Sequence, residues 1–182
     1  ADIVIVNKVN AAPKEAVARM RARLAEILPD VPTVLADSLV QLSEVPPPGA
    51  KVLVVDDGPT LTHGGMAFGA GYQALAGLDV DIVDPRDSAT PAILEVFRQF
   101  PHLGPVLPAV GYGPEQRQAL RATIDSSEAD FVVAGTPIDF AKAVGVSKPV
   151  LRARYDYADH GHSSLLDLVS ERLAKRSDQA PE

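Results

Sequence analysis

Short apolar runs rich in Val, Ile and Leu alternate along the chain with longer segments whose apolar residues recur with helical periodicity. The apolar runs predict strands at residues 3–6, 33–36, 52–55, 81–83, 106–109, 131–134 and 150–154. The periodic segments predict helices at residues 14–28, 65–76, 91–100, 115–126, 138–143 and 163–175. Strands this apolar, each followed by a helix, are typical of a parallel sheet covered on both faces. The pattern therefore predicts a three-layer α/β fold, with a mostly parallel sheet of about six or seven strands and helices on both faces.

The length of 182 residues suits one globular domain with a full core. We therefore expect a single α/β domain over residues 1–176. Within it, the Pro-rich segment 44–50 predicts a joint, because consecutive prolines favour stiff, extended backbone. The polar residues 177–182 predict a flexible tail. Because the chain begins with Ala1 and reaches an apolar strand almost at once, we expect it to be a fragment of a longer protein.

Composition and charge limit the classes of partner. Seventeen Lys and Arg against 24 Asp and Glu give a formal net charge of −7, which argues against nucleic acid or an anionic membrane surface as a partner. No apolar run approaches the roughly 20 residues that span a bilayer. The absence of Cys excludes a disulfide framework and weakly favours a cytoplasmic protein. An anionic ligand would need a local basic pocket, and a homo-oligomer remains an open option.

Several catalytic signatures are absent or misplaced. No Lys follows a Gly, so the chain contains no phosphate-binding P-loop. It has no Gly-x-Ser-x-Gly elbow and no Cys, so we do not expect acyl-enzyme chemistry. Residues 69–74 fit a dinucleotide-binding fingerprint, but their glycines lie inside a predicted helix instead of at the turn that leaves a strand. We interpret them as small residues that let a helix pack closely on the sheet, with a Rossmann-type oxidoreductase as the alternative.

The most specific stretch is residues 52–66, in which an apolar strand ends in Asp56 and Asp57. Adjacent carboxylates at a strand end can position a hydrated Mg²⁺ or accept a proton. The groups that follow are hydroxyls, an imidazole and two glycines: Thr60, Thr62, His63, Gly64 and Gly65. We expect the two glycines to open the next helix, whose first amides would bind an anion. The alternative is that the acids only cap and turn the chain.

Basic side chains lie at or near other predicted strand ends. Those that could neutralise a bound phosphate are Arg86, His102, Arg152 and Arg154. Of these, Arg152 and Arg154 are two positions apart on a strand and therefore share one face. The alternative for each is an ordinary surface ion pair or local hydrogen bond. Farther along the chain, residues 160–162 (His-Gly-His) have the spacing of a two-histidine metal clip, although a polar loop before the last helix is the simpler interpretation.

Asn7-Lys8-Val9-Asn10, directly after the first predicted strand, resembles the Asn-Lys-x-Asp base-recognition motif of GTPases. Asn10 stands where the motif has a carboxylate. Because an amide offers one donor and one acceptor, it matches adenine better than guanine and weakly favours ATP over GTP. The alternative is an Asn that caps the following helix.

Several of these motifs together resemble the cyclic 2,3-diphosphoglycerate synthetase-like P-loop NTPases. The matching segments, in chain order, are residues 7–10, 36–38, 56–66, 83–86, 100–102, 107–112, 135–139 and 152–155. The resemblance implies ATP-driven formation of a phosphoanhydride on a small phosphorylated acid, with Mg²⁺ and ATP (or GTP) as cofactors. It places base recognition on Asn7, Lys8, Asn10, Thr136 and Asp139.

In that family the nucleotide site depends on a P-loop upstream of the matched region. The chain therefore looks like the carboxy-terminal part of such an enzyme, and we expect it to be inactive alone, because phosphoryl transfer needs the phosphate-binding loop. In the intact protein, Asp56, Asp57 and His63 would be catalytic, and the two acids would hold Mg²⁺. The alternative function is a non-catalytic, GTPase-like nucleotide sensor or an assembly module.

Overall fold

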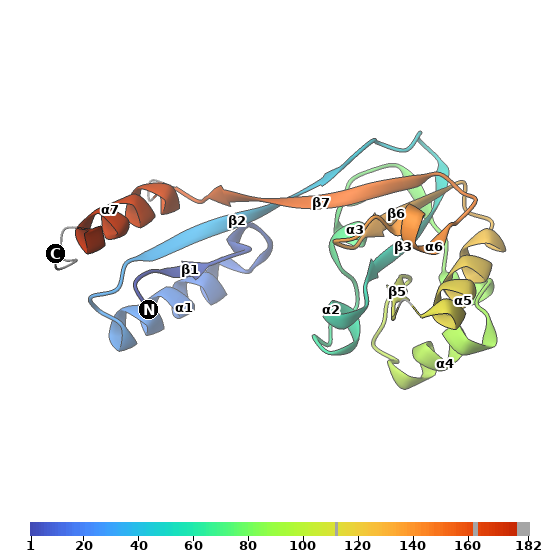
Figure 1. Cartoon of the computed structure of the whole chain (residues 1–182), viewed down its shortest axis with the longest axis horizontal. Helices are drawn as coiled ribbons and strands as arrows, with labels where there is room; N and C mark the ends of the chain where they lie inside the picture. The colour runs from blue at the N-terminus through green and yellow to red at the C-terminus, as the bar shows by residue number, and fades with distance from the viewer. Residues whose placement is uncertain (112, 162–163, 178–182) are drawn as a thin grey trace. The chain divides into compact units, whose positions relative to one another are not determined.

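A computed structural model of the chain describes residues 1–111, 113–161 and 164–177. Most of the predicted tail and one histidine of the predicted metal clip, His162, lie outside the described residues. The described chain forms two compact units. One consists of Ala1–Leu39 and the chain from Asp156 onward, and the other is Val40–Tyr155. The strands β2 (Thr33–Leu42) and β7 (Val150–Asp159) each have one end in each unit (Figure 1).

The Val40–Tyr155 unit is built around the central strand β3 (Ala50–Asp57). One edge of β3 pairs with β6 (Phe131–Gly135), which pairs in turn with β7. Along its other edge, β3 pairs first with β4 (Val80–Ile82) and then, nearer its carboxyl end, with β5 (Leu107–Ala109). All these pairings are parallel. Their carboxyl ends therefore lie at the same edge of the sheet, where the ligands of such sheets usually bind.

Helices and a large core surround this sheet. The helices are α2 (Gly58–Thr62), α3 (Ala70–Gln73), α4 (Pro91–Gln99), α5 (Pro114–Asp125) and α6 (Phe140–Val144), with a 3-10 turn η2 (Pro85–Asp87). Four consecutive residues of β3, Val52, Leu53, Val54 and Val55, are fully buried. Because neighbouring strand residues point to opposite faces, β3 is covered on both sides, which confirms the predicted α/β class.

The other unit is smaller. Strand β1 (Val4–Val6) pairs in parallel with β2, from Val4 opposite Thr33 to Val6 opposite Leu35. The 3-10 turn η1 (Val9–Ala11) and helix α1 (Lys14–Ile27) connect β1 to β2, and helix α7 (Leu165–Ser177) follows β7. None of the helices in the described part of the chain has the length and apolar character that crossing a membrane requires.

The predicted strands are all present, but two are much longer than expected. β2 and β7 are neighbours in the sheet and continue through polar residues to Leu42 and Asp159. In the larger unit, the Ser43 amide donates to the Arg152 carbonyl at 2.8 Å. Hydrogen bonds between the two segments thus satisfy the backbone amides and carbonyls even where the sequence has no apolar strand pattern. The boundaries of the two units lie within these two strands, and the expected single domain with a joint near 44–50 stays a prediction.

The predicted helix at residues 65–76 is wrong. Two short helices, α2 and α3, lie on either side of a loop that contains Gly65, whose φ is +64°. A left-handed residue ends a helix, so residue 65 cannot lie inside one. The Asp57 side chain caps α2 and Pro59 lies in its first turn, so the helix starts earlier than the apolar pattern suggests.

Candidate functional site

Asp56 ends the buried part of β3 and is itself fully buried. Its Oδ2 accepts a hydrogen bond from the Gly69 amide and its Oδ1 accepts one from the Gly71 amide, both at 2.7 Å. A third, longer bond of 3.5 Å comes from the Tyr72 amide. Burial raises the pKa of Asp56, because it disfavours the charged form, and the three amide bonds lower it in part. Both carboxylate oxygens are therefore committed to the backbone at the start of α3.

This contact fixes α3 against the carboxyl end of β6. A Cβ at Gly71 would lie 2.8 Å from Asp56 Oδ1, 3.1 Å from the Gly135 amide nitrogen and 3.1 Å from a methyl carbon of Val54. Only a residue without a side chain fits there, in agreement with the close-packing interpretation of these glycines. The geometry favours a positioning role for Asp56 over the predicted catalytic and metal-binding roles, because both its oxygens already have partners.

Asp57 has a different environment. Its Oδ2 accepts hydrogen bonds from the Thr60 amide at 3.2 Å and from the Thr60 hydroxyl at 2.8 Å, which makes it the N-cap of α2. Its Oδ1 has no hydrogen-bond partner among the described residues. Mg²⁺ commonly binds through one or two carboxylates together with water and phosphate oxygens, and one free carboxylate oxygen fits that requirement. In the described part of the chain no group of three or more acidic, His or Cys side chains could hold a metal ion.

The expectation that Gly64 and Gly65 open a helix is wrong, and an anion site at these residues stays a prediction without that support. Helix α2 begins at Gly58 and ends at Thr62, so both glycines follow a helix instead of opening one. Their amides therefore do not form a helix N-terminus. The start of α2 is packed against the end of β5, since a Cβ at Gly58 would lie 3.2 Å from Val110 Cα and closer still to the Ala109 carbonyl.

The hydrogen bonds around the end of α2 determine which nitrogen of His63 is free. The Thr62 hydroxyl lies 2.9 Å from the Gly58 carbonyl oxygen, which can only accept a hydrogen bond. The hydroxyl has one proton and donates it there, so His63 Nδ1, at 3.0 Å, must donate to the Thr62 oxygen. In the neutral ring this leaves Nε2 of the exposed His63 without a proton. The predicted base thus has a suitable tautomer.

His102 approaches the same helix with the opposite tautomer. Its Nε2 lies 3.0 Å from the Leu61 carbonyl oxygen and must donate to it, which leaves Nδ1 as the acceptor. Phe100 contacts the His102 ring edge to face, with 6.2 Å between the ring centres. The last turn of α2 therefore lies close to two imidazoles.

At the carboxyl end of β6, a second group of predicted residues comes together. The Thr136 hydroxyl and Arg152 Nη2 each lie 3.5 Å from the Ile138 carbonyl oxygen. Thr136 is almost completely buried, whereas Arg154 is exposed. The alternating burial of β7 places the two arginines on the same face, as predicted. Asp139 caps α6 by accepting a hydrogen bond from the Lys142 amide at 3.2 Å.

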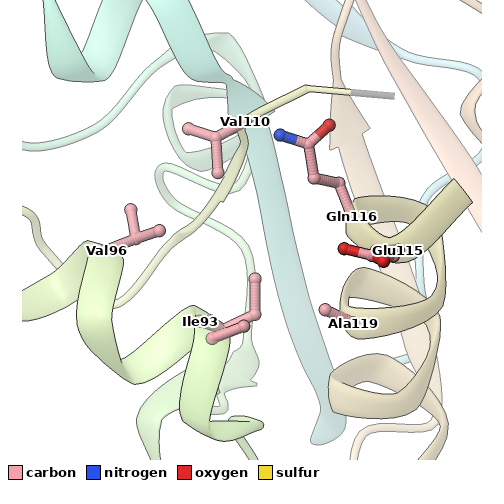
Figure 2. Close-up of a pocket in the computed structure, with 7 residues that line it drawn as sticks. Ile93, Val96, Val110, Glu115, Gln116 and Ala119 are labelled. Atoms are coloured by element: carbon pink, nitrogen blue, oxygen red, sulfur yellow. The ribbon is translucent and has the colours of Figure 1, made fainter. Parts of the chain in front are cut away.

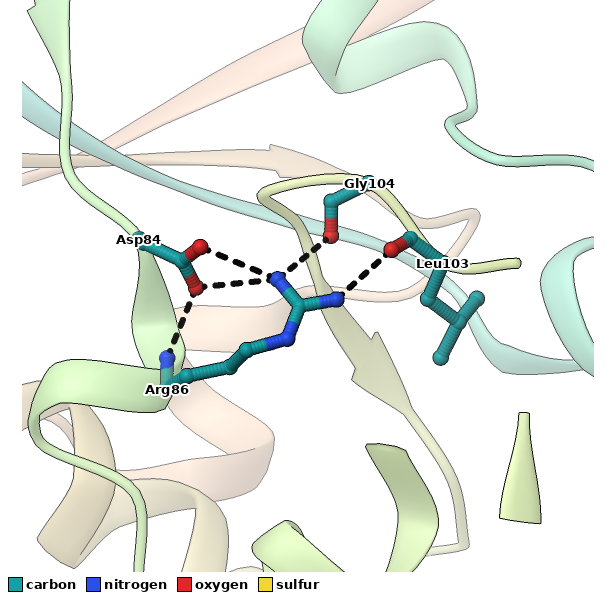
Figure 3. A network of polar contacts seen from close by, with 4 residues as sticks. All are labelled: Asp84, Arg86, Leu103 and Gly104. Carbon is teal, nitrogen blue, oxygen red and sulfur yellow. Dashed lines mark hydrogen bonds and ion pairs between the residues drawn. The ribbon is translucent and has the colours of Figure 1, made fainter. Parts of the chain in front are cut away.

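Arg86 is held by the protein itself (Figure 3). Its Nη1 contacts both carboxylate oxygens of Asp84 at 3.0 Å and the Gly104 carbonyl at 3.2 Å, while Nη2 donates to the Leu103 carbonyl at 2.6 Å. The guanidinium also lies 4.2 Å from the centre of the Phe97 ring. These contacts occupy both terminal nitrogens, so the geometry favours a structural role over the predicted phosphate contact.

The three predicted base-binding residues near the start of the chain belong to the smaller unit. Asn7 Oδ1 accepts a hydrogen bond from the Lys8 amide at 2.7 Å. The Asn10 side chain pairs with the backbone of Ser38 in β2, donating to its carbonyl and accepting from its amide, both at 3.0 Å. The Asn10 amide therefore already uses one donor and its acceptor within the protein.

A pocket that the sequence did not indicate lies between α4 and α5 (Figure 2). Its volume is about 240 Å³, and its lining comes from α4, α5 and the end of β5: Ala92, Ile93, Val96, Val110, Glu115, Gln116 and Ala119. None of these is a predicted site residue. The apolar spacing of Ile93 and Val96 on α4 is a signal for helix packing, which is why it gave no indication of a pocket.

Comparisons with known proteins show sequence similarity between the chain and an enzyme. No family model matches it. The chain is 37% identical, over 173 residues, to the arginine synthetase ArcE of Thermococcus kodakarensis. The match covers 94% of this chain but only 39% of that enzyme. The two units thus correspond to a part of a longer relative, and the resemblance to cyclic 2,3-diphosphoglycerate synthetases stays a prediction.

Proposed function

We propose that the chain is part of an ATP-dependent ligase that acts on a small polar substrate. The observation that carries this proposal is the similarity, over 94% of the chain, to an enzyme named arginine synthetase. A synthetase of this kind couples bond formation to cleavage of a nucleoside triphosphate. The resemblance to cyclic 2,3-diphosphoglycerate synthetases implies related chemistry, because there too ATP drives the formation of a bond on a small acid.

The carboxyl edge of the β3 and β6 strands supplies groups for such a reaction. Asp57 would contribute its free Oδ1 to Mg²⁺, whose charge would help to stabilise the transferred phosphoryl group. His63 would accept a proton at Nε2 from the attacking group. Thr136 and Arg152 would bind a phosphate or carboxylate near the end of β6. Asp56 would hold the start of α3 in place beneath them.

Two substrate classes are consistent with this proposal. The resemblance to the diphosphoglycerate enzymes favours a small phosphorylated acid, and the name of the relative favours an amino acid. Both carry at least one anionic group for an arginine to bind. The nucleotide would be ATP or GTP. Its phosphates would need binding groups in addition to those of this chain, which contains no P-loop.

The test is substrate-dependent cleavage of nucleotide by the protein that contains this chain. Phosphate release from ATP and from GTP, each with Mg²⁺, is measured against a panel of amino acids and small phosphorylated acids. We expect Asp57→Asn and His63→Ala each to reduce kcat at least about a hundredfold, the usual contribution of a positioned acid or base. Asp81→Asn, a change at an exposed position on β4, is the control.

Unchanged turnover in both folded variants would refute the site assignment. Nucleotide binding without cleavage on any member of the panel would instead favour the non-catalytic alternative, a nucleotide sensor.

A further inference from the structure

A second histidine site lies in the smaller unit, outside the carboxyl edge described above. His160 follows β7, and its Nδ1 lies 2.9 Å from Oδ1 and 3.1 Å from Oδ2 of Asp37 in β2. The two residues are 123 positions apart in the chain. The His160 amide also donates to the Leu35 carbonyl at 2.9 Å, so the backbone at this histidine continues the pairing with β2. Sheet structure therefore holds the imidazole beside the carboxylate.

The carboxylate determines which ring nitrogen of His160 is reactive. A carboxylate can only accept a hydrogen bond, so Nδ1 carries a proton and donates it to Asp37. In the neutral ring, Nε2 then has a free lone pair. The His160 side chain is 51% exposed, whereas that of Asp37 is 21% exposed. The oriented ring therefore has its unprotonated nitrogen available to a molecule from solution.

The strand that carries Asp37 is also held by a side-chain contact at the next residue. Ser38, the next residue in β2, binds the Asn10 side chain through both its amide and its carbonyl. A carboxylate fixed in a strand and bonded to a histidine through Nδ1 is the arrangement that orients and activates a histidine for proton or group transfer. Fold stability alone does not explain such a pair, because exposed ion pairs contribute little to it.

We propose that His160 is a nucleophile that accepts a phosphoryl group on Nε2 and that Asp37 is its positioning residue. This inference rests on the proposed function for its phosphoryl donor, a nucleoside triphosphate. The Nε2 lone pair forms a bond to the γ-phosphorus, and the bond between that phosphorus and the β,γ-bridging oxygen breaks. The nucleoside diphosphate leaves with the electron pair. The Nδ1 proton stays on the ring, and Asp37 balances the positive charge that develops there. Nothing is oxidised or reduced.

Phosphoramidate tests this reactivity without any nucleotide site, because it transfers phosphate directly to histidine. The complete 182-residue chain is treated with it. Phosphorylation at each histidine is followed over time by mass spectrometry, and ³¹P NMR assigns the nitrogen that carries the phosphate. We expect His160 to react at least about tenfold faster than His63 and His102, and on Nε2, because Asp37 blocks Nδ1 and orients the ring with Nε2 toward solution.

The positioning role predicts a specific pattern among variants. Asp37→Asn should reduce the rate at His160 about tenfold, into the range of the other histidines, and should allow phosphate on Nδ1 as well. Asp37→Glu should restore part of the rate and the preference for Nε2. Asp30→Asn, at an exposed position of the same unit, is the control and should change neither. Circular dichroism establishes that each variant is folded.

An equal rate at His63, His102 and His160, or an unchanged rate and nitrogen preference in folded Asp37→Asn, would overturn the inference. A protein that cleaves nucleotide at the normal rate with His160→Gln would overturn it as well, while the proposed function would stand. Selective labelling of His160 in a protein that cleaves no nucleotide would support the nucleophile and remove the proposed function. The two proposals can therefore fail separately.

Discussion

Replacing Arg86 by Lys tests whether this arginine supports the fold or binds a ligand. The guanidinium ties the turn η2 to the segment before β5 through the carbonyls of Leu103 and Gly104. It also pairs with Asp84 and lies over Phe97. Lysine keeps the positive charge, but its single ammonium group cannot reproduce the planar fork that reaches these partners together.

The expected loss in the free energy of unfolding follows from the contacts that lysine cannot keep. A hydrogen bond from a charged donor is worth about 1.5–3 kcal/mol when buried. Arg86 and Asp84 have side chains that are 34% and 39% exposed, so we take the lower end of that range for one lost carbonyl bond. The half-exposed ion pair adds about 0.5 kcal/mol and the contact with Phe97 about 0.5–1 kcal/mol. Arg86→Lys should therefore destabilise the larger unit by about 2.5–3 kcal/mol.

Arg98 provides a matched control, because it is also paired with an acid, Glu95, but both side chains are largely exposed at 73% and 68%. Arg98→Lys should cost at most about 0.5 kcal/mol. Urea unfolding at pH 7, followed by circular dichroism, measures both variants. If the two lose the same stability, the network in Figure 3 does not support the fold. If Arg86→Lys is as stable as the unsubstituted protein but binds phosphate-bearing ligands more weakly, the original phosphate role is correct.

Four further outcomes are expected. Asp56→Asn should lower the free energy of unfolding in urea by about 2–4 kcal/mol, because an amide has one acceptor for the two short bonds that the carboxylate accepts. Asp57→Asn should lower it by less than about 1 kcal/mol, because asparagine is also a good helix cap. Burial raises the pKa of Asp56 in the folded protein above the pKa of the same group in the unfolded chain. The contribution of Asp56 to stability is therefore fully present below the unfolded pKa and is lost as the pH rises through the folded pKa. The difference in unfolding free energy between the protein and Asp56→Asn should shrink over this pH range. In Gly71→Ala, the higher helix propensity of alanine should stabilise the protein by about 1 kcal/mol, and overpacking against Asp56 should destabilise it by about 1–3 kcal/mol. We therefore expect a lower melting temperature in thermal unfolding. Burial and the hydrogen bond to Asp159 raise the pKa of Tyr157 to about 12, which an ultraviolet titration measures, and Asp159→Asn should lower that pKa toward the ordinary value.

The sequence predicted the fold well where burial determines the residue types. β3 and β6 are apolar because both their faces are covered, so their positions follow directly from the pattern. The parts of β2 and β7 that extend beyond the predicted ranges are polar, and they depend on pairing between segments more than a hundred residues apart in the chain. A local pattern contains no information about such a partner. The loop at Gly65 was missed because periodicity counts apolar residues and ignores the backbone angles that glycine permits.

Residue type also could not show which basic side chains are free. Arg86 and Arg152 look equivalent in the sequence, since each lies near the end of an apolar segment. The carbonyls that occupy Arg86 belong to residues 17 and 18 positions later, in a loop whose path depends on the tertiary fold. Arg152 makes one long contact of 3.5 Å to a carbonyl through its Nη2 and keeps more of its donors available. The donors of Arg86 already have partners in the protein, which indicates a structural role, whereas Arg152 has donors left to bind a ligand.

The adjacent acids show that the sequence held more information than the prediction used. The sequence prediction makes Asp56 and Asp57 one magnesium-binding pair, yet neighbouring residues of a strand point to opposite faces. Since β3 is covered on both faces, one acid had to enter the interior and find donors there, as Asp56 does at the two glycine amides. The other could remain at the open end of the strand, where Asp57 caps α2 and keeps one oxygen free. Strand alternation alone therefore argues for two separate roles, and it makes Asp57 the acid through which the proposed magnesium chemistry would have to act.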